Sequence, residues 1–409
     1  MRFPESSSSF VVAFIIAVTA PVAAQPAPGP AAPTPEAPSP TVPPPVPVVE
    51  SPGPAPVPPA PTQLKIELGN GTSIRFGLLW QAQYEARGNS ANDGVTQNLF
   101  LRRFALLLGG TVLRDFEYFF DSDFADLLKA PTGDLSLKNG PGFQPKDALA
   151  TYKAIGDQFK IDGGLFLPAG SHNSLQGGGS IYSWDFFANT FRHSTAFGTT
   201  ANPYGRDLGV QARGLLFDGL LEYRAGVFQG LRVPPSATKP AGRNPFRVAG
   251  RVQLNLLDPE TVFFYAGTYL GTKRIFSIGA TADFQYDDSG SYRSFGGDAF
   301  VDVPVGPGGI TAQVDVVHRN GGAIVTALPK QTFIGLEAGY RFDAIKLSPI
   351  GRFEKRWQTG ADESVVGGGL AWWAFGHTSN LKAFYSRIIP GGDVKGFDQF
   401  NLQWQLAFY

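Results

Sequence analysis

Apolar and polar side chains alternate with a period of two in many short stretches of this chain. Near the carboxyl end, Phe400, Leu402 and Trp404 alternate with Asn401 and Gln403. Successive side chains of a strand point to opposite faces, so this stretch predicts a β-strand with one apolar and one amide-rich face. The apolar face would meet a core in a soluble sandwich, or lipid in a transmembrane barrel with a wet lumen.

Sixteen stretches of this kind are predicted as strands. They cover residues 73–86, 99–108, 117–124, 147–155, 158–168, 206–216, 219–229, 245–256, 274–286, 294–303, 310–319, 331–342, 346–357, 363–375, 379–389 and 398–409. A further candidate at 261–270 would make the count odd. Because an even number is needed when both ends of a barrel lie on one side of the membrane, we interpret residues 261–273 as a turn excursion or partial strand.

The predicted connections alternate in length, which a soluble sandwich has no reason to do. Short turns near 156–157, 217–219, 306–309 and 376–379 alternate with longer segments at 125–146, 169–205, 230–244, 320–330 and 390–397. Outer-membrane barrels have short periplasmic turns and longer external loops. Aromatic residues toward the strand ends fit interfacial girdles, or reflect only their high β-propensity. The predicted fold is all-β, a 16-stranded antiparallel transmembrane β-barrel over residues 63–409.

Composition supports an all-β fold and excludes several kinds of chemistry. The 409 residues include 50 Gly, 34 Phe and 13 Tyr, which favours strands and turns over helices. The chain has no Cys, which excludes disulfides, thiolate metal sites and cysteine nucleophiles. The formal net charge is zero, so no nucleic-acid partner is predicted.

Two segments precede the predicted barrel. Residues 1–24 carry Arg2, an apolar run and a small-residue ending, which is typical of a secretory signal peptide; a short buried helix is the alternative. Residues 25–62 are rich in Pro and Ala, which predicts a disordered or polyproline II linker in the periplasm. The linker could serve as a spacer or bind a partner such as the cell wall.

Several segments resemble one porin family in their order and spacing. They are residues 100–103 (FLRR), 156–168, 205–214, 225–230, 247–256 and 276–280. Together they are similar to the phosphate-selective porins of the O and P type, over roughly residues 64–409. The resemblance implies a homotrimeric outer-membrane barrel whose third external loop, here the constriction loop of residues 169–204, folds inward and narrows the lumen. The family usually has a third Arg where this chain has Ala105, which weakens the inference of strict phosphate selectivity.

Arginines on the predicted inward face are the candidate anion-binding residues. They are Arg75, Arg103, Arg213, Arg224, Arg247, Arg251, Arg352 and Arg356, with Arg103 taken from the family pattern. A planar guanidinium can bind phosphate or carboxylate through two parallel hydrogen bonds and stays charged. The alternative is that these side chains pair with inward carboxylates in the barrel wall. In or next to the constriction loop, Arg192, His193 and Arg206 could face the narrowest part of the pore.

The predicted function is passive diffusion of small anionic or neutral solutes through the outer membrane, with a preference for phosphate-like anions. A general diffusion pore with little charge preference is the alternative. The four histidines show no metal-ligand spacing, and neither a cofactor nor enzymatic activity is predicted. An outer-membrane hydrolase, with His318 as its only testable histidine, is the second alternative. The predicted surroundings are lipid and lipopolysaccharide, and the terminal aromatic Tyr409 resembles the signal taken up by the barrel-assembly machinery.

Overall fold

The computed structural model describes residues 64–89, 94–130, 138–140, 142–197, 205–233, 235, 244–288 and 290–409, except for the side chains of residues 191, 192, 194 and 195. The predicted signal peptide (1–24) and linker (25–62) lie outside the described residues, as do the Arg192 side chain and residues 198–204 of the constriction loop.

Sixteen antiparallel strands close into a barrel within the described part of the chain, as the sequence predicts. The strands are β2 (Thr72–Gly88), β3 (Val95–Val112), β4 (Phe116–Asp123), β5 (Gln144–Ile155), β6 (Phe159–Phe166), β7 (Asp207–Leu216), β8 (Leu221–Phe228), β9 (Arg247–Asn255), β10 (Ile275–Asp287), β11 (Gly290–Val305), β12 (Gly308–Asn320), β13 (Gln331–Phe342), β14 (Leu347–Gln358), β15 (Glu363–Phe375), β16 (Ser379–Pro390) and β17 (Phe397–Phe408). Each of the sixteen predicted stretches corresponds to one strand, and residues 261–273 belong to none.

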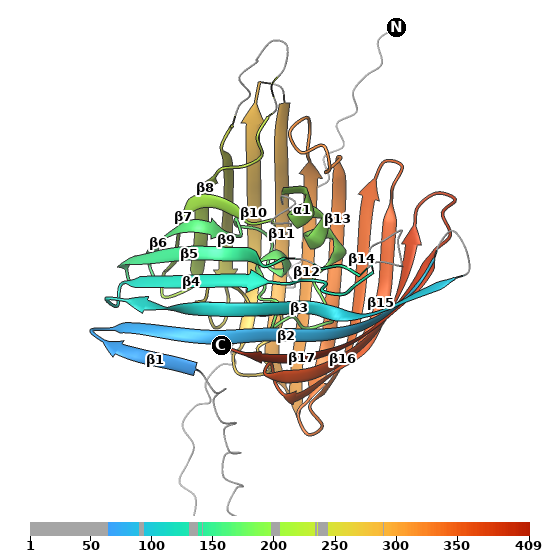
Figure 1. Cartoon of the computed structure of the whole chain (residues 1–409), viewed down its shortest axis with the longest axis horizontal. Coiled ribbons are helices and arrows are strands. Elements are labelled where there is room, and N and C mark those ends of the chain that lie inside the picture. The colour runs from blue at the N-terminus through green and yellow to red at the C-terminus, as the bar shows by residue number, and fades with distance from the viewer. Residues whose placement is uncertain are drawn as a thin grey trace, which may run out of the picture. The chain divides into compact units, whose positions relative to one another are not determined.

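The barrel is closed where the last strand pairs with β2, which lie side by side in Figure 1. Inside this seam, Gln81 donates to Gln405 over 2.7 Å and Gln83 donates to Asn401 over 3.0 Å. The amides that alternate with apolar residues in the sequence therefore hold the closure together. A strand that the sequence does not predict, β1 (Leu64–Gly69), pairs with the start of β2 outside the ring.

The distribution of side chains is inverted relative to a soluble protein. Trp404 and Leu402 are 48% and 38% exposed on the outer surface, whereas Gln403 and Gln405 are buried within the lumen. The same alternation recurs along β9, β10 and β12. An apolar exterior around a polar interior is the pattern that lipid contact selects in a barrel. No helix in the described residues is long and apolar enough to cross a membrane.

The two ends of the barrel differ in their connections. We call the end that holds Thr72 and Phe408 the turn end and the opposite end the loop end. The longest loop-end connection joins β6 to β7 and contains the constriction loop. Within that loop lie a 3₁₀ turn, η1 (Asn173–Leu175), and the helix α1 (Ala188–Phe197). One connection at the turn end, residues 256–274 between β9 and β10, is unusually long; we call it the lumenal turn.

Candidate functional site

Two adjacent arginines of β3 point into the lumen because the strand is bulged there. Gln81 of β2 pairs with Arg103, but the next residue, Ala82, pairs with Leu101, so Arg102 is the extra residue of a β-bulge. The bulge reverses the alternation, and both guanidinium groups can then reach one partner. Sequence reasoning selected Arg103 and missed Arg102. A signal was present, since the outward apolar residues change from odd positions (Leu99) to even positions (Leu106) across this site.

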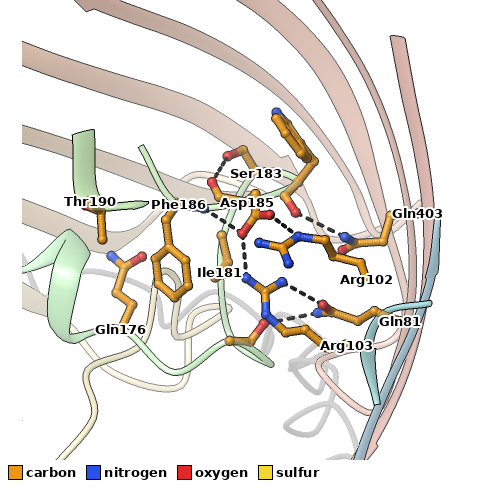
Figure 2. A network of polar contacts seen from close by, with 12 residues as sticks. Gln81, Arg102, Arg103, Gln176, Ile181, Ser183, Asp185, Phe186, Thr190 and Gln403 are labelled. Carbon is orange, nitrogen blue, oxygen red and sulfur yellow. Dashed lines mark hydrogen bonds and ion pairs between the residues drawn. The ribbon is translucent and has the colours of Figure 1, made fainter. Parts of the chain in front are cut away.

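Asp185 of the constriction loop is that shared partner. Its carboxylate lies 2.7 Å from Nε of Arg102 and 2.5 Å from Nη2 of Arg103, and its side chain is 1% exposed. Burial alone would raise the pKa of Asp185, but the charges of Arg102 and Arg103 outweigh it and hold this pKa well below its ordinary value. The carboxylate therefore stays ionised and ties the loop to β3 (Figure 2).

Wall side chains also hold the backbone of the constriction loop, by donating to its carbonyl oxygens. The pairs are Gln81 to Gly178 (3.1 Å), Gln405 to Gly179 (2.8 Å), Lys382 to Ile181 (2.6 Å) and Ser183 (2.8 Å), Gln403 to Trp184 (3.2 Å) and Arg352 to Asp185 (2.6 Å). Figure 2 shows two of these side chains, Gln81 of β2 and Gln403 of β17, reaching toward the loop. Because a loop cannot leave its backbone groups buried and unpaired, this network fixes its path through the lumen.

The lumenal turn enters the barrel from the turn end and meets the constriction loop. Tyr265 bridges residue 176 through two backbone hydrogen bonds, from its N–H to Leu175 (3.0 Å) and from Gly177 N–H to its carbonyl (2.9 Å). Gly267 donates to Ser180 over 3.0 Å. A Cβ atom at Gly267 would lie 2.7 Å from the backbone nitrogen of Tyr182, so only glycine allows this approach. Two connections from opposite ends are thus joined inside the lumen.

A buried contact between His172 and Glu260 reinforces this junction. His172 Nε2 lies 3.0 Å from Glu260 Oε2, both side chains are fully buried, and the imidazole stacks between the rings of Tyr265 and Phe300. Burial alone would raise the pKa of Glu260, but the charge of His172 and its hydrogen bonds lower it. The histidine that sequence analysis left unassigned therefore joins the constriction loop to the lumenal turn.

Two cavities of the lumen lie along β2 to β6. A main cavity of about 720 Å³ is lined by both Arg102 and Arg103, and it extends from Lys146 and Arg206 to Tyr409. A second cavity of about 650 Å³, which we call the turn-end cavity, lies beside the start of β2. Among its described lining residues, five cations face two carboxylates: Lys65, Arg75, Lys153, Lys160 and Arg213 against Glu117 and Asp157.

The predicted arginines divide between the open space and the filled side of the lumen. Arg75, Arg103, Arg206 and Arg213 line the cavities. Arg224 donates to Glu222 and to the carbonyl of Phe263, Arg247 pairs with Asp283 (2.6 Å), Arg251 pairs with Asp298 (2.6 Å), Arg352 pairs with Glu354 (2.6 Å), and Arg356 donates to Gln358. These last five do not line either cavity; Arg224, Arg251 and Arg352 also donate to carbonyls of the inward connections.

The cavity arginines differ in how they are neutralised. Arg206 forms two hydrogen bonds with Asp147, and Arg213 lies 2.7 Å from Asp162. Arg75 forms no ion pair within the described residues, and its Nε has no hydrogen-bond partner there. Its guanidinium carbon instead lies 3.8 Å from the centre of the Tyr409 ring. Arg75 is therefore the cavity cation best placed to meet a passing anion.

The remaining candidate histidines have structural contacts. His193 lies on α1, where Nε2 is 2.9 Å from the hydroxyl of Tyr292; burial and the charge of Arg319 lower its pKa to about 4. His318 contacts the Thr332 hydroxyl over 2.9 Å. Within the described residues, no group of three or more metal-ligating side chains is positioned to hold a metal ion.

Comparisons with known proteins identify the fold. No family model matches the chain, and no curated protein matches it in sequence. Among solved structures, the chain is similar to the anion-selective porin of Comamonas acidovorans (TM-score 0.54, 11% identity, 82% of this chain and 100% of that one). It is also similar to Pseudomonas putida OprB (TM-score 0.54, 10% identity, 83% and 94%) and to the trimer form of Vibrio cholerae OmpT (TM-score 0.50, 12% identity, 83% and 100%). The chain has the fold of an outer-membrane porin barrel.

Proposed function

We propose that this protein is an outer-membrane porin through which small hydrophilic solutes diffuse passively. The observation that carries the proposal is the open space along β2 to β6, which lies inside a closed barrel with an apolar exterior. The inward connections narrow this space without filling it. A pore of this kind selects solutes by the width and charge of its narrowest part.

The charges along the open space favour anions over cations. Arg102 and Arg103 lie beside the constriction, and the turn-end cavity holds an excess of cations, including Arg75, which forms no ion pair within the described residues. In the loop-end part of the main cavity, positive and negative charges are closer to balance, because Asp121 and Asp123 face Lys146. We therefore propose a moderate anion preference, in keeping with the anion-selective porin of Comamonas acidovorans, which has a similar fold. Phosphate-like anions belong to this class, as the resemblance to the O and P porins implies.

Only some of the predicted arginines are proposed to contact solutes. Arg75, Arg103, Arg206 and Arg213, together with Arg102, form the proposed anion track. Arg224, Arg247, Arg251, Arg352 and Arg356 are proposed to act in the wall, where most of them neutralise buried carboxylates. The side chain of Arg192 lies outside the described residues. Its proposed place at the narrowest part of the pore rests on the sequence alone.

The proposed oligomeric state and cellular location follow from the proposed porin function. We propose a homotrimer in the bacterial outer membrane, surrounded by lipid and lipopolysaccharide, which the trimer form of Vibrio cholerae OmpT supports by analogy of fold. Tyr409 is proposed to be recognised by the barrel-assembly machinery. The signal peptide of residues 1–24 is proposed to direct export. Cross-linking of the detergent-solubilised protein tests the trimer directly.

A general diffusion pore remains the competing function, and reversal potentials in a KCl gradient separate the two. Purified protein in planar bilayers should give a reversal potential whose sign shows that chloride passes more readily than potassium. Arg75→Gln should shift that potential toward potassium, whereas Arg387→Gln should not, because Arg387 pairs with Asp398 on the exposed surface. A cation-selective wild type would overturn the anion preference, and a protein that forms no conducting pore would overturn the porin proposal. No observation favours the hydrolase alternative; His318, its candidate residue, contacts the Thr332 hydroxyl.

A further inference from the structure

Three aromatic rings from distant parts of the chain form the boundary between the two cavities. Phe119 of β4, Phe264 of the lumenal turn and Tyr409 line both the main cavity and the turn-end cavity. The Phe119 ring centre lies 5.9 Å from that of Phe264 and 5.6 Å from that of Tyr409. We call these three residues the aromatic collar. A solute that moves between the cavities passes these rings.

Two rings of the collar, Tyr409 and Phe264, are held in place by the surrounding structure. The side chain of Tyr409 packs over two wall glycines, because a Cβ atom would lie 1.9 Å from its hydroxyl oxygen at Gly109 and 2.6 Å from its ring at Gly77. Phe264 is fixed by its neighbour Tyr265, whose backbone bonds to the constriction loop and whose hydroxyl donates to Glu222 (2.9 Å). The collar is thus a built element of the lumen, and both the constriction loop and the lumenal turn determine its geometry.

Guanidinium groups lie on both sides of the collar. Arg103 lines the main cavity, and its guanidinium carbon is 5.4 Å from the centre of the Phe186 ring, which lines the same cavity. On the other side, Arg75 lines the turn-end cavity and contacts the face of Tyr409. A solute at the collar therefore meets ring faces in the middle and cationic groups before and after them.

This arrangement fits a particular kind of anion. A strongly hydrated inorganic anion must lose water to pass the faces of aromatic rings, which offer it no hydrogen bond in return. A flat apolar body gains contact with the rings, while a carboxylate on its edge can bind a guanidinium. Building on the proposed porin function, we infer that the collar is a binding site for aromatic monocarboxylates and favours their passage over inorganic phosphate.

The inference is tested with the full-length protein in planar bilayers, by measuring how added benzoate, acetate and phosphate reduce the chloride current. Benzoate should reduce the current at lower concentrations than either acetate or phosphate. Replacing two of the three rings, Phe119→Leu with Phe264→Leu, keeps the site apolar but removes two of its ring faces. We expect this variant to raise the half-blocking concentration of benzoate by about 3- to 10-fold, since one aromatic contact contributes on that scale, and to leave acetate unchanged.

Two controls keep the result interpretable. Phe295→Leu removes a ring from the outer surface, where Phe295 is 49% exposed, and should leave the benzoate effect unchanged. The reversal potential in the same bilayers reports the proposed anion preference independently of the collar. A channel that is anion-selective but blocked more strongly by phosphate than by benzoate would overturn the inference alone. An unchanged ratio of benzoate to acetate block in the double variant would do so as well.

Discussion

Replacing Asp185 by Asn tests whether one carboxylate both anchors the constriction loop and sets the charge of the pore. The carboxylate pairs with Arg102 and Arg103 and accepts a further hydrogen bond from the Phe186 N–H (3.0 Å). An asparagine keeps the shape of the side chain but cannot neutralise either guanidinium. Two buried cations then remain beside the open space without their shared partner.

The magnitude follows from the burial of this group. Removing one partner of a buried, hydrogen-bonded ion pair costs about 3–5 kcal/mol, because the remaining charge is desolvated without compensation. Asp126 provides a matched control, since it also pairs with Arg102 (3.2 Å) but its side chain is 38% exposed. Exposed pairs contribute at most about 1 kcal/mol, so Asp126→Asn should change stability much less although it removes the same charge.

The loss of stability and the change in ion selectivity in Asp185→Asn are measured separately. Unfolding of the detergent-solubilised protein, monitored by the far-ultraviolet signal of the strands or by heat-modified gel mobility, reports stability. The reversal potential in a KCl gradient reports selectivity, which should shift further toward chloride in Asp185→Asn. An Asp185→Asn protein with the stability and reversal potential of the Asp126→Asn protein would refute the view that Asp185 anchors the loop.

The lowered pKa of Asp185 determines the pH range in which this residue stabilises the protein. Because its pKa is lowered in the folded protein, its contribution to stability is complete above the unfolded value of about 3.9 and is lost only as the pH falls through the folded value. The anchor should therefore persist through mildly acidic conditions. A loss of the Asp185-dependent selectivity between pH 7 and pH 5 would contradict this assignment.

Other regions of the lumen give further predictions. Gly267→Val should separate the lumenal turn from the constriction loop at a cost of about 1–3 kcal/mol, as overpacking does, and should change the single-channel conductance. His193 has a pKa lowered to about 4, so the neutral form is favoured in the folded state; its contribution to stability is complete above about pH 6.5 and is lost as the pH falls toward 4. Unfolding measured across this range should show a weaker pH dependence in His193→Gln than in the wild type, and an identical dependence would contradict the assignment. Arg213→Gln should be less stable than the wild type by about 3 kcal/mol or more, because it leaves buried Asp162 without its ion-pair partner, and thermal unfolding measures this loss.

The alternation of apolar and polar residues predicted the sixteen strands of the barrel and most of the faces that they present to the lumen, but it missed β1 and the bulge at Arg102. The prediction was possible because the period of two is a local property: the alternation around Trp404 requires an apolar surface on one side whatever the rest of the chain does. The same reasoning correctly excluded residues 261–273 from the strands, since a closed barrel with both ends on one side needs an even count. The inward direction of Arg75, Arg103 and Arg247 was also readable in this way.

The role of each inward arginine depends on the partner that the folded chain places beside it. In the sequence Arg247 and Arg75 look alike, yet Arg247 is neutralised by Asp283 while Arg75 has no ion pair in the described structure. The partner of Arg103 is separated from it by 82 residues, on a connection whose path depends on contacts with several strands at once. Alternation reports whether a side chain points inward, but it carries no information about which loop fills the space in front of it. The division of the lumen into a packed side and an open side is therefore a property of the folded chain alone.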